Sequence, residues 1–172
     1  MLTNSSTKDI TAFSVSLRYI AADGKIQQGQ YDAENSPNGI AVPAGGTVTE
    51  HIGAPGPGST VLPTVTAVVF SDDTAAGDPI AINNIFARRR AWVAGTQAAM
   101  EVLKRDVNKS TGEAITDLQT LEKTLPHDEA HGVRSVWEAM KGDHSTPAKK
   151  VAEKQTDLTA LKAHSIAKGT NK

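Results

Sequence analysis

Residues 64–90 read TVTAVVFSDDTAAGDPIAINNIFARRR, and inside this stretch one kind of pattern replaces another. Residues 65–70 place apolar side chains on both sides of an extended chain, which predicts a strand buried on both faces of a sheet. Asp78 followed by Pro79 is a strong helix start, because the carboxylate can cap the first free N–H groups and proline fits the first helical position. We therefore predict that strand gives way to helix between residues 73 and 83, with Asp78 as the cap.

The residues before this stretch have the two-residue period of β-strands. Residues 10–20 (ITAFSVSLRYI) predict the clearest strand. Its apolar face consists of Phe13, Val15, Leu17 and Tyr19. Asp23-Gly24 signals a hairpin turn, and residues 25–31 predict a more polar returning strand near a sheet edge. Short strands separated by Gly/Pro turns are typical of an antiparallel immunoglobulin-like β-sandwich, which we assign to residues 1–78.

The residues after Pro79 have the three- and four-residue spacing of an amphipathic helix. The apolar stripe keeps its phase from Ile82 to Leu125, which favours one long helix over two. Gly95 and Gly112 weaken this helix without needing to break it. Residues 110–113 also fit a capping box, which would start a second helix there.

Two further helices follow. Pro126 ends the long segment, residues 127–141 predict a short helix, and Thr146-Pro147 repeats the pattern of a cap followed by proline. Residues 167–172 predict a loose tail. Residues 79–172 are therefore expected to form a helical hairpin or three-helix bundle, and the whole chain is expected to be of the α+β class.

The apolar residues in the middle of the long stripe need other apolar residues to bury them. A sandwich of under about 80 residues can bury only the first turns of such a helix. The apolar positions beyond those turns are Leu103, Val107, Leu118 and Leu121. The later helices carry few apolar residues to cover them. We therefore expect the helical part either to pack loosely or to self-associate along this seam.

Three segments resemble a group of bacterial proteins of uncharacterised function. The segments are TNSSTKDITAFSVSLRYIAADGK (residues 3–25), AVVFSDDTAAGD (residues 67–78) and IFARRR (residues 85–90). Proteins of this group resemble the chain in having a small immunoglobulin-like β-sandwich followed by a helix with a run of arginines near its start. The resemblance covers about the first half of the chain and implies a fold, without implying any catalytic residue.

Composition excludes several classes of protein. Formal net charge is −1, from 18 basic and 19 acidic residues, so no global field attracts the chain to nucleic acid or to anionic lipid. The chain has no cysteine, which excludes disulfides and thiol chemistry. No run approaches the roughly 18 apolar residues of a membrane span. We expect no cofactor.

The compartment stays open at this stage. Leu2-Thr3-Asn4 looks like the end of a strand whose beginning is missing, so the first strand of the sandwich is expected to be truncated. An export signal lost with that beginning would favour a periplasmic or extracellular protein, and otherwise the cytoplasm is expected.

Two histidines form the only arrangement that resembles a metal site. His127 and His131 lie four residues apart on one helical face and could share a zinc ion, as in a metal-dependent hydrolase. The zinc motif His-Glu-x-x-His has glutamate after the first histidine, whereas this chain has Asp128. Glu138 and His144 are near in sequence, but neither is an obvious third ligand. We expect no metal at this position.

The run Arg88-Arg89-Arg90 could contact phosphates, but it lacks aromatic partners and a nucleic-acid-binding fold. Arg89 lies on the apolar stripe, between Ile82 and Val93. We therefore predict that Arg89 is buried and hydrogen-bonded inside the protein, with its two neighbours more exposed.

Trp92 and Trp137 are expected to pack between helices, and Leu118 and Leu121 to lie at the self-association seam. With Asp78 and Arg89 these residues make up the predicted structural or interaction sites. The sequence thus predicts a non-enzymatic binding or structural protein, acting through the sandwich loops or the helical surface on a protein partner. The alternatives are the metal-dependent hydrolase and a weak nucleic-acid contact through the arginine run.

Overall fold

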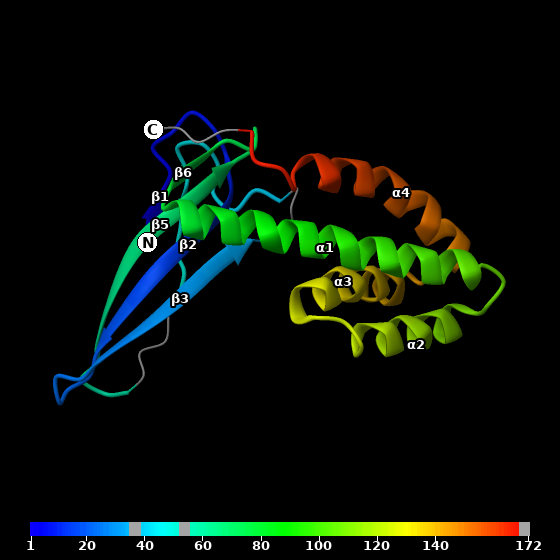
Figure 1. Cartoon of the computed structure of the whole chain (residues 1–172), viewed down its shortest axis with the longest axis horizontal. Helices are drawn as coiled ribbons and strands as arrows, with labels where there is room; N and C mark the ends of the chain where they lie inside the picture. The colour runs from blue at the N-terminus through cyan, green and yellow to red at the C-terminus, as the bar shows by residue number, and fades with distance from the viewer. Residues whose placement is uncertain (35–38, 52–55, 169–172) are drawn as a thin grey trace. The chain divides into compact units, whose positions relative to one another are not determined.

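The computed structural model of the chain describes residues 1–34, 39–51 and 56–168. These residues form two compact units, and the boundary between them lies inside the first helix (Figure 1). The sheet unit contains residues 1–85 together with Ala167 and Lys168, and the helical unit contains Phe86–Ile166.

Two antiparallel sheets make up the strands of the sheet unit. The larger sheet has the order β3-β2-β5-β6 and consists of β2 (Ile10–Ile20), β3 (Ile26–Glu34), β5 (Thr60–Phe70) and β6 (Ala75–Gly77). The smaller sheet pairs β1 (Leu2–Thr3) with β4 (Thr47–Val48). β2 and the edge position of β3 agree with the prediction. Four helices follow these strands in the described part of the chain, so the α+β class is confirmed.

One face of the larger sheet, which we call the inner face, carries the core of the sheet unit. Phe13, Val15 and Leu17 are buried there, as their alternation predicted. Leu2 and Val48 of the smaller sheet pack against the same cluster. The opposite face, which we call the outer face, carries the polar residues that alternate with these apolar ones.

β5 is a central strand, but only its last part is buried. Ala67 and Val69 are buried, whereas Val65 is 44% exposed and Leu62 is 45% exposed. The prediction of a strand buried throughout residues 65–70 is therefore wrong at its beginning. The reason is the shortness of the neighbouring elements, since β6 pairs only with residues 67–69 and β1 and β4 have two residues each.

The change from strand to helix occurs where the sequence predicted it. Gly77 has a φ of +118°, and a Cβ atom there would lie 2.2 Å from the carbonyl oxygen of Thr66, so glycine is required. Helix α1 (Pro79–Arg105) starts directly after Asp78. The Asp78 carboxylate accepts the backbone N–H groups of Ile80 and Ala81, each at 2.9 Å. Asp78 is therefore the helix cap.

The remaining helices are α2 (Thr111–Glu122), α3 (His127–Asp143) and α4 (Pro147–Ala163). The preference for one long helix up to residue 125 is therefore wrong. Asp106 is buried after the end of α1, where it pairs with Arg105 at 2.8 Å and with Lys109 at 3.1 Å. Ser110 and Glu113 then form the capping box that starts α2. Local hydrogen bonding at the turn outweighs the continuity of the apolar stripe.

α1 and α3 approach each other at two glycines. A Cβ atom on Gly95 would lie 1.9 Å from the carbonyl oxygen of Glu129, and one on Gly132 would lie 2.3 Å from the carbonyl oxygen of Trp92. The two backbones are therefore in direct contact, and any side chain at either position would have to separate them.

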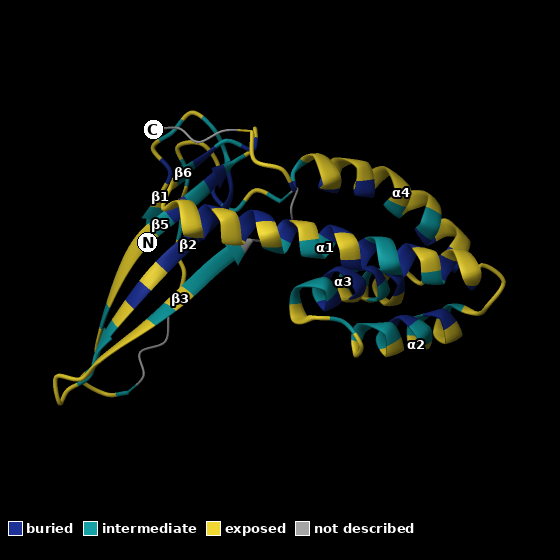
Figure 2. Cartoon of the chain, viewed as in Figure 1, coloured by how far each residue is buried: buried dark blue, intermediate teal, exposed yellow. Residues whose placement is uncertain are grey.

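The seam expected to lack cover is filled by the chain itself. Leu103 and Leu118 have no exposed surface, and α3 supplies the residues that pack against them. Those residues are Val133, Val136 and Met140. Figure 2 shows buried positions along α1, α2 and α3. Leu121 is half-buried in the same cluster, while Val107 lies beyond the end of α1 and is 44% exposed. The predicted shortage of apolar cover is wrong, because α2 folds back instead of continuing α1.

The chain returns to the sheet unit after α4. Lys168 donates its backbone N–H to the carbonyl oxygen of Asp73 at 3.1 Å, and its ammonium group lies 3.0 Å from the buried carboxylate of Asp73. The predicted loose tail thus starts with an anchored residue, and residues 169–172 lie outside the described part of the chain. Among the described helices, none combines the length and apolar character that crossing a membrane requires.

Candidate functional site

Arg89 is buried inside the helical unit, as predicted. Its side chain is 1% exposed, whereas Arg88 is half-buried and Arg90 is exposed. The guanidinium donates a hydrogen bond to the backbone carbonyl of His164 at 3.1 Å and lies 5.5 Å from the centre of the Phe86 ring. The arginine run therefore presents only one of its three guanidinium groups fully to solvent.

The predicted histidine pair does come together. The rings of His127 and His131 lie 4.7 Å apart, and the His131 ring stacks on Trp92 at 6.2 Å. His127 is exposed and lies 3.3 Å from the carboxylate of Asp128. Within the described residues, no three side chains of the metal-ligating types gather around one point. The pair packs as aromatic rings beside Trp92.

The other predicted site residues belong to the interior of the helical unit. Leu118 is fully buried and Leu121 is half-buried in its core. The Trp137 indole N–H donates to Glu122 at 2.7 Å, and Arg134 donates to the same carboxylate. Burial acts to raise the pKa of Glu122, but the hydrogen bonds from Arg134 and Trp137 outweigh it and hold that pKa below its ordinary value. These groups satisfy one another.

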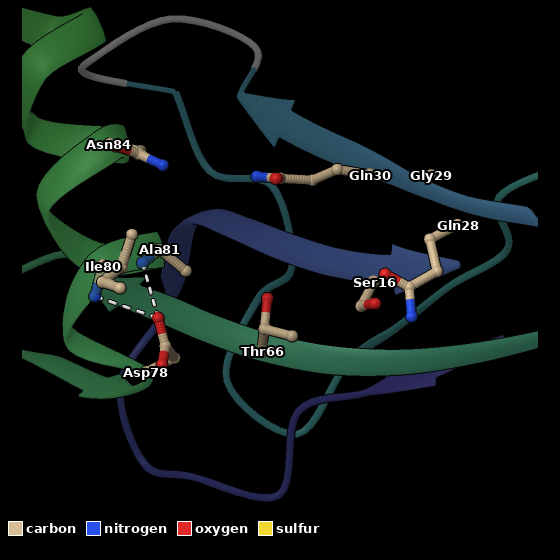
Figure 3. Close-up of a pocket in the computed structure, with 9 residues that line it drawn as sticks. All are labelled: Ser16, Gln28, Gly29, Gln30, Thr66, Asp78, Ile80, Ala81 and Asn84. Carbon is tan, nitrogen blue, oxygen red and sulfur yellow. Dashed lines mark hydrogen bonds between the residues drawn. The ribbon is translucent and has the colours of Figure 1, made fainter. Parts of the chain in front are cut away.

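The sheet unit has an open groove of about 490 Å³ on its outer face (Figure 3). We call it the outer-face groove. Residues from β2, β3 and β5 and from the first two turns of α1 surround it. They are Ser16, Gln28, Gly29, Gln30, Thr66, Asp78, Ile80, Ala81 and Asn84. The volume lies within the range of about 300–1,000 Å³ that is typical of small-molecule sites.

The strands hold some groups of the groove in fixed positions. Thr66 donates its hydroxyl proton to the backbone carbonyl of Ser14 at 3.2 Å. The Gln30 amide nitrogen donates to the Ser14 hydroxyl at 3.1 Å and to the Asp32 carboxylate at 3.0 Å. Ser14 itself has no exposed surface. Buried Ser14 therefore anchors both side chains, Thr66 through its backbone carbonyl and Gln30 through its hydroxyl.

The helix side of the groove is set by the turn before α1. Asp78 donates its backbone N–H to the carbonyl of Thr66 at 2.8 Å, which ties the start of the helix to β5. Ile80 and Asn84 are four residues apart and therefore lie on one helical face. The Ile80 side chain is 71% exposed. Figure 3 shows Asn84 and Gln30 pointing toward each other across the groove.

The groove is equipped for binding by hydrogen bonds. Its lining contains two hydroxyls, three amides and one carboxylate, and none of its residues is a histidine. The single carboxylate already caps α1 through one of its oxygens. Such a set can position a ligand, but it holds no nucleophile paired with a general base.

Sequence reasoning identified parts of this site without joining them. The alternation in residues 10–20 separated Ser16 from the apolar face of the strand, and Asp78 was identified as a cap. The Gln-rich strand that faces Ser16 offered a further signal, because Gln28 and Gln30 project to the same face in any antiparallel pairing with β2. The sequence could not show that the helix start lies beside them.

Comparisons with protein-family models, with curated proteins and with solved structures found no match. The likeness to bacterial sandwich proteins thus stays a resemblance in sequence, and function has to be argued from the side chains themselves.

Proposed function

We propose that this chain is a non-enzymatic binding protein whose ligand site is the outer-face groove. The observation that carries the proposal is a convergence of unused hydrogen-bonding groups. In the described part of the chain, the side chains of Gln28 and Asn84 make no hydrogen bond, and the second carboxylate oxygen of Asp78 accepts none. β3 and the start of α1, which are distant in sequence, bring these groups to one open volume, where a ligand can use them.

The proposal includes the finer architecture of the sheet unit, which we take to be an immunoglobulin-like β-sandwich. Two antiparallel sheets that share one apolar core support this assignment. In such a sandwich the inner face of the larger sheet is occupied by the core, so recognition falls to the part of the outer face that is open to solvent.

The helical unit serves as a scaffold in this proposal. Its seam is filled by its own core, so self-association along Leu118 and Leu121 is not needed to explain the apolar stripe. Arg89 is used inside the unit, and the proposal assigns no nucleic-acid contact to the arginine run. Partner binding is assigned to the outer-face groove instead.

The test is an amide chemical-shift titration of the full chain with a panel of neutral sugars, polyamines and inorganic phosphate. Ser16→Trp fills the floor of the groove and is expected to abolish binding of whichever compound binds. Gln28→Ala is expected to weaken it. Gln27→Ala is the matched control, because Gln27 is the neighbouring exposed residue of the same type and projects to the opposite face. Equal binding by Ser16→Trp and the unmodified chain would overturn the proposal.

A further inference from the structure

The fixed groups of the outer-face groove present oxygen acceptors. The Thr66 hydroxyl donates its hydrogen bond to the Ser14 carbonyl, so it has only its lone pairs to offer to the groove. The Gln30 amide nitrogen is held by Ser14 and Asp32, which leaves the amide oxygen as the free end. Asp78 contributes its second carboxylate oxygen. A ligand of this groove therefore has to bring hydrogen-bond donors.

The charge of the groove disfavours anions. Among the described residues that line the groove, Asp78 is the only ionisable one, and its carboxylate already occupies the first free N–H groups of α1, where an anion would otherwise bind. The positive end of the helix also offsets much of the Asp78 charge, so the groove is not a strong trap for cations. These two effects together favour a neutral ligand.

The adaptable groups match hydroxyls in particular. Gln28 and Asn84 each carry an amide, which offers donors and an acceptor at neighbouring atoms. A sugar hydroxyl both donates and accepts, and a run of hydroxyls can satisfy such an amide at both ends. Ile80 and Ala81 add an apolar surface on the helix side, against which the C–H face of a sugar ring can pack. The groove is open to solvent, which suits a segment of a longer chain.

From this arrangement, and resting on the proposed function, we infer that the outer-face groove recognises a neutral, hydroxyl-rich ligand, namely a short oligosaccharide segment. Thr66, Gln30 and Asp78 accept hydrogen bonds from its hydroxyls. The amide groups of Gln28 and Asn84 both donate to and accept from these hydroxyls, and so select for the orientation of the hydroxyls.

The experiment measures binding to the full chain by calorimetry, with cellotetraose, maltotetraose and tetra-N-acetylchitotetraose as neutral probes and with spermidine and inorganic phosphate as charged ones. At least one neutral probe is expected to bind. Thr66→Val keeps the shape of the side chain and removes its oxygen, so it is expected to weaken that binding about tenfold, the effect of one hydrogen bond to the ligand. Thr64→Val is the matched control, because Thr64 is an exposed residue of the same strand that does not line the groove.

The outcomes distinguish the inferred ligand class from the proposed function of the groove as a binding site. Oligosaccharide binding that is lost in Ser16→Trp and weakened in Thr66→Val, but not in Thr64→Val, supports both. Binding of spermidine or phosphate alone, lost in Ser16→Trp, overturns the ligand class and leaves the groove as the site. If an oligosaccharide binds equally well to the unmodified chain, Ser16→Trp and Thr66→Val, both the ligand class and the proposed function are overturned. The same conclusion follows if no probe shows binding that depends on the groove.

Discussion

The helical unit and the sheet unit use their polar side chains in opposite ways. In the helical unit the buried charged groups bond to one another or to the backbone, as Arg89 does with His164 and Lys150 with Asp143. In the outer-face groove, Gln28 and Asn84 have no such internal partner within the described residues. The unit with the more conspicuous charge pattern in the sequence therefore uses its buried charges internally.

The difference shows that a high number of charged residues does not by itself leave polar groups available to a ligand. Lys150 is 3% exposed and its ammonium group donates hydrogen bonds to Asp143 and Glu153, so it contributes to stability. Uncharged amides on a sheet face remain accessible because no neighbouring element competes for them. We therefore expect substitutions in the helical unit to change stability and substitutions in the outer-face groove to change binding.

The largest effect is expected at the contact between α1 and α3. Gly95→Ala and Gly132→Ala each place a methyl group within 2.3 Å of a backbone carbonyl oxygen, and the two helices have to separate. We expect a loss of about 3 kcal/mol or more in the free energy of unfolding, at the upper end of overpacking effects. Urea unfolding followed by circular dichroism measures it.

Gly112→Ala is the control for this prediction, because a Cβ atom there meets nothing within 4 Å. It is expected to stabilise the helix by about 0.5 kcal/mol. Similar unfolding midpoints for Gly95→Ala and Gly112→Ala would contradict the backbone contact.

A smaller loss is expected for Arg89→Ala, which removes a buried guanidinium and leaves the His164 carbonyl without this donor. The expected cost is about 1.5–3 kcal/mol, the range for a hydrogen bond to a charged group. Arg90→Ala changes an exposed arginine next to it and is expected to stay within about 0.5 kcal/mol. Equal costs for the two variants would return the arginine run to the interpretation as a basic surface patch.

Acid should weaken the helical unit in part through one ion pair. The hydrogen bond from Lys150 holds the pKa of Asp143 well below its ordinary value. A carboxyl with a lowered pKa stabilises the folded state above its unfolded pKa of about 3.9, and this stability is lost as pH falls through the folded value. Asp143→Asn is therefore expected to show a smaller drop in unfolding free energy between neutral and acidic pH than the unmodified chain.

Urea unfolding at a series of pH values measures this difference. Asp157→Asn removes an exposed partner of Lys154 and serves as the control. If Asp143→Asn and the unmodified chain lose stability in parallel on acidification, the ion pair has no such role.

The smallest effect on stability is expected in the outer-face groove. Gln28→Ala and Thr66→Val change side chains on an open surface and are expected to stay within about 1 kcal/mol of the unmodified chain. A larger loss of unfolding free energy in the same urea experiment would mean that the groove residues hold the sheet together. Polar side chains would then serve stability in both units, and the difference between the units would not hold.

Local signals in the sequence predicted a large part of this fold. Asp78-Pro79 marked the start of α1, the alternation in residues 10–20 marked β2, and the stripe placed Arg89 in the interior. Each of these predictions depends either on residues within a few positions of one another or on a regular spacing of apolar residues.

The features that sequence reasoning missed depend on distant pairs. Gly95 was interpreted as a weak point of a helix, and only its contact with α3 shows why glycine is needed there. The outer-face groove exists because the backbone of Asp78 is bonded to Thr66, which brings the helix start beside two strands. The end of α1 was misplaced for another reason, since the buried Asp106 and the capping box outweigh an apolar stripe that continues in phase.

The contact between Lys168 and Asp73 has a consequence for how the protein is made. The ribosome adds about 5–20 residues per second and makes the strands of the sheet unit before the helices. The buried Asp73 carboxylate meets Lys168 only after the whole helical unit has been synthesised, several seconds later at that rate. The unit that is translated first is therefore the unit that completes its contacts last, and its final ion pair forms only on a chain whose helices have already emerged.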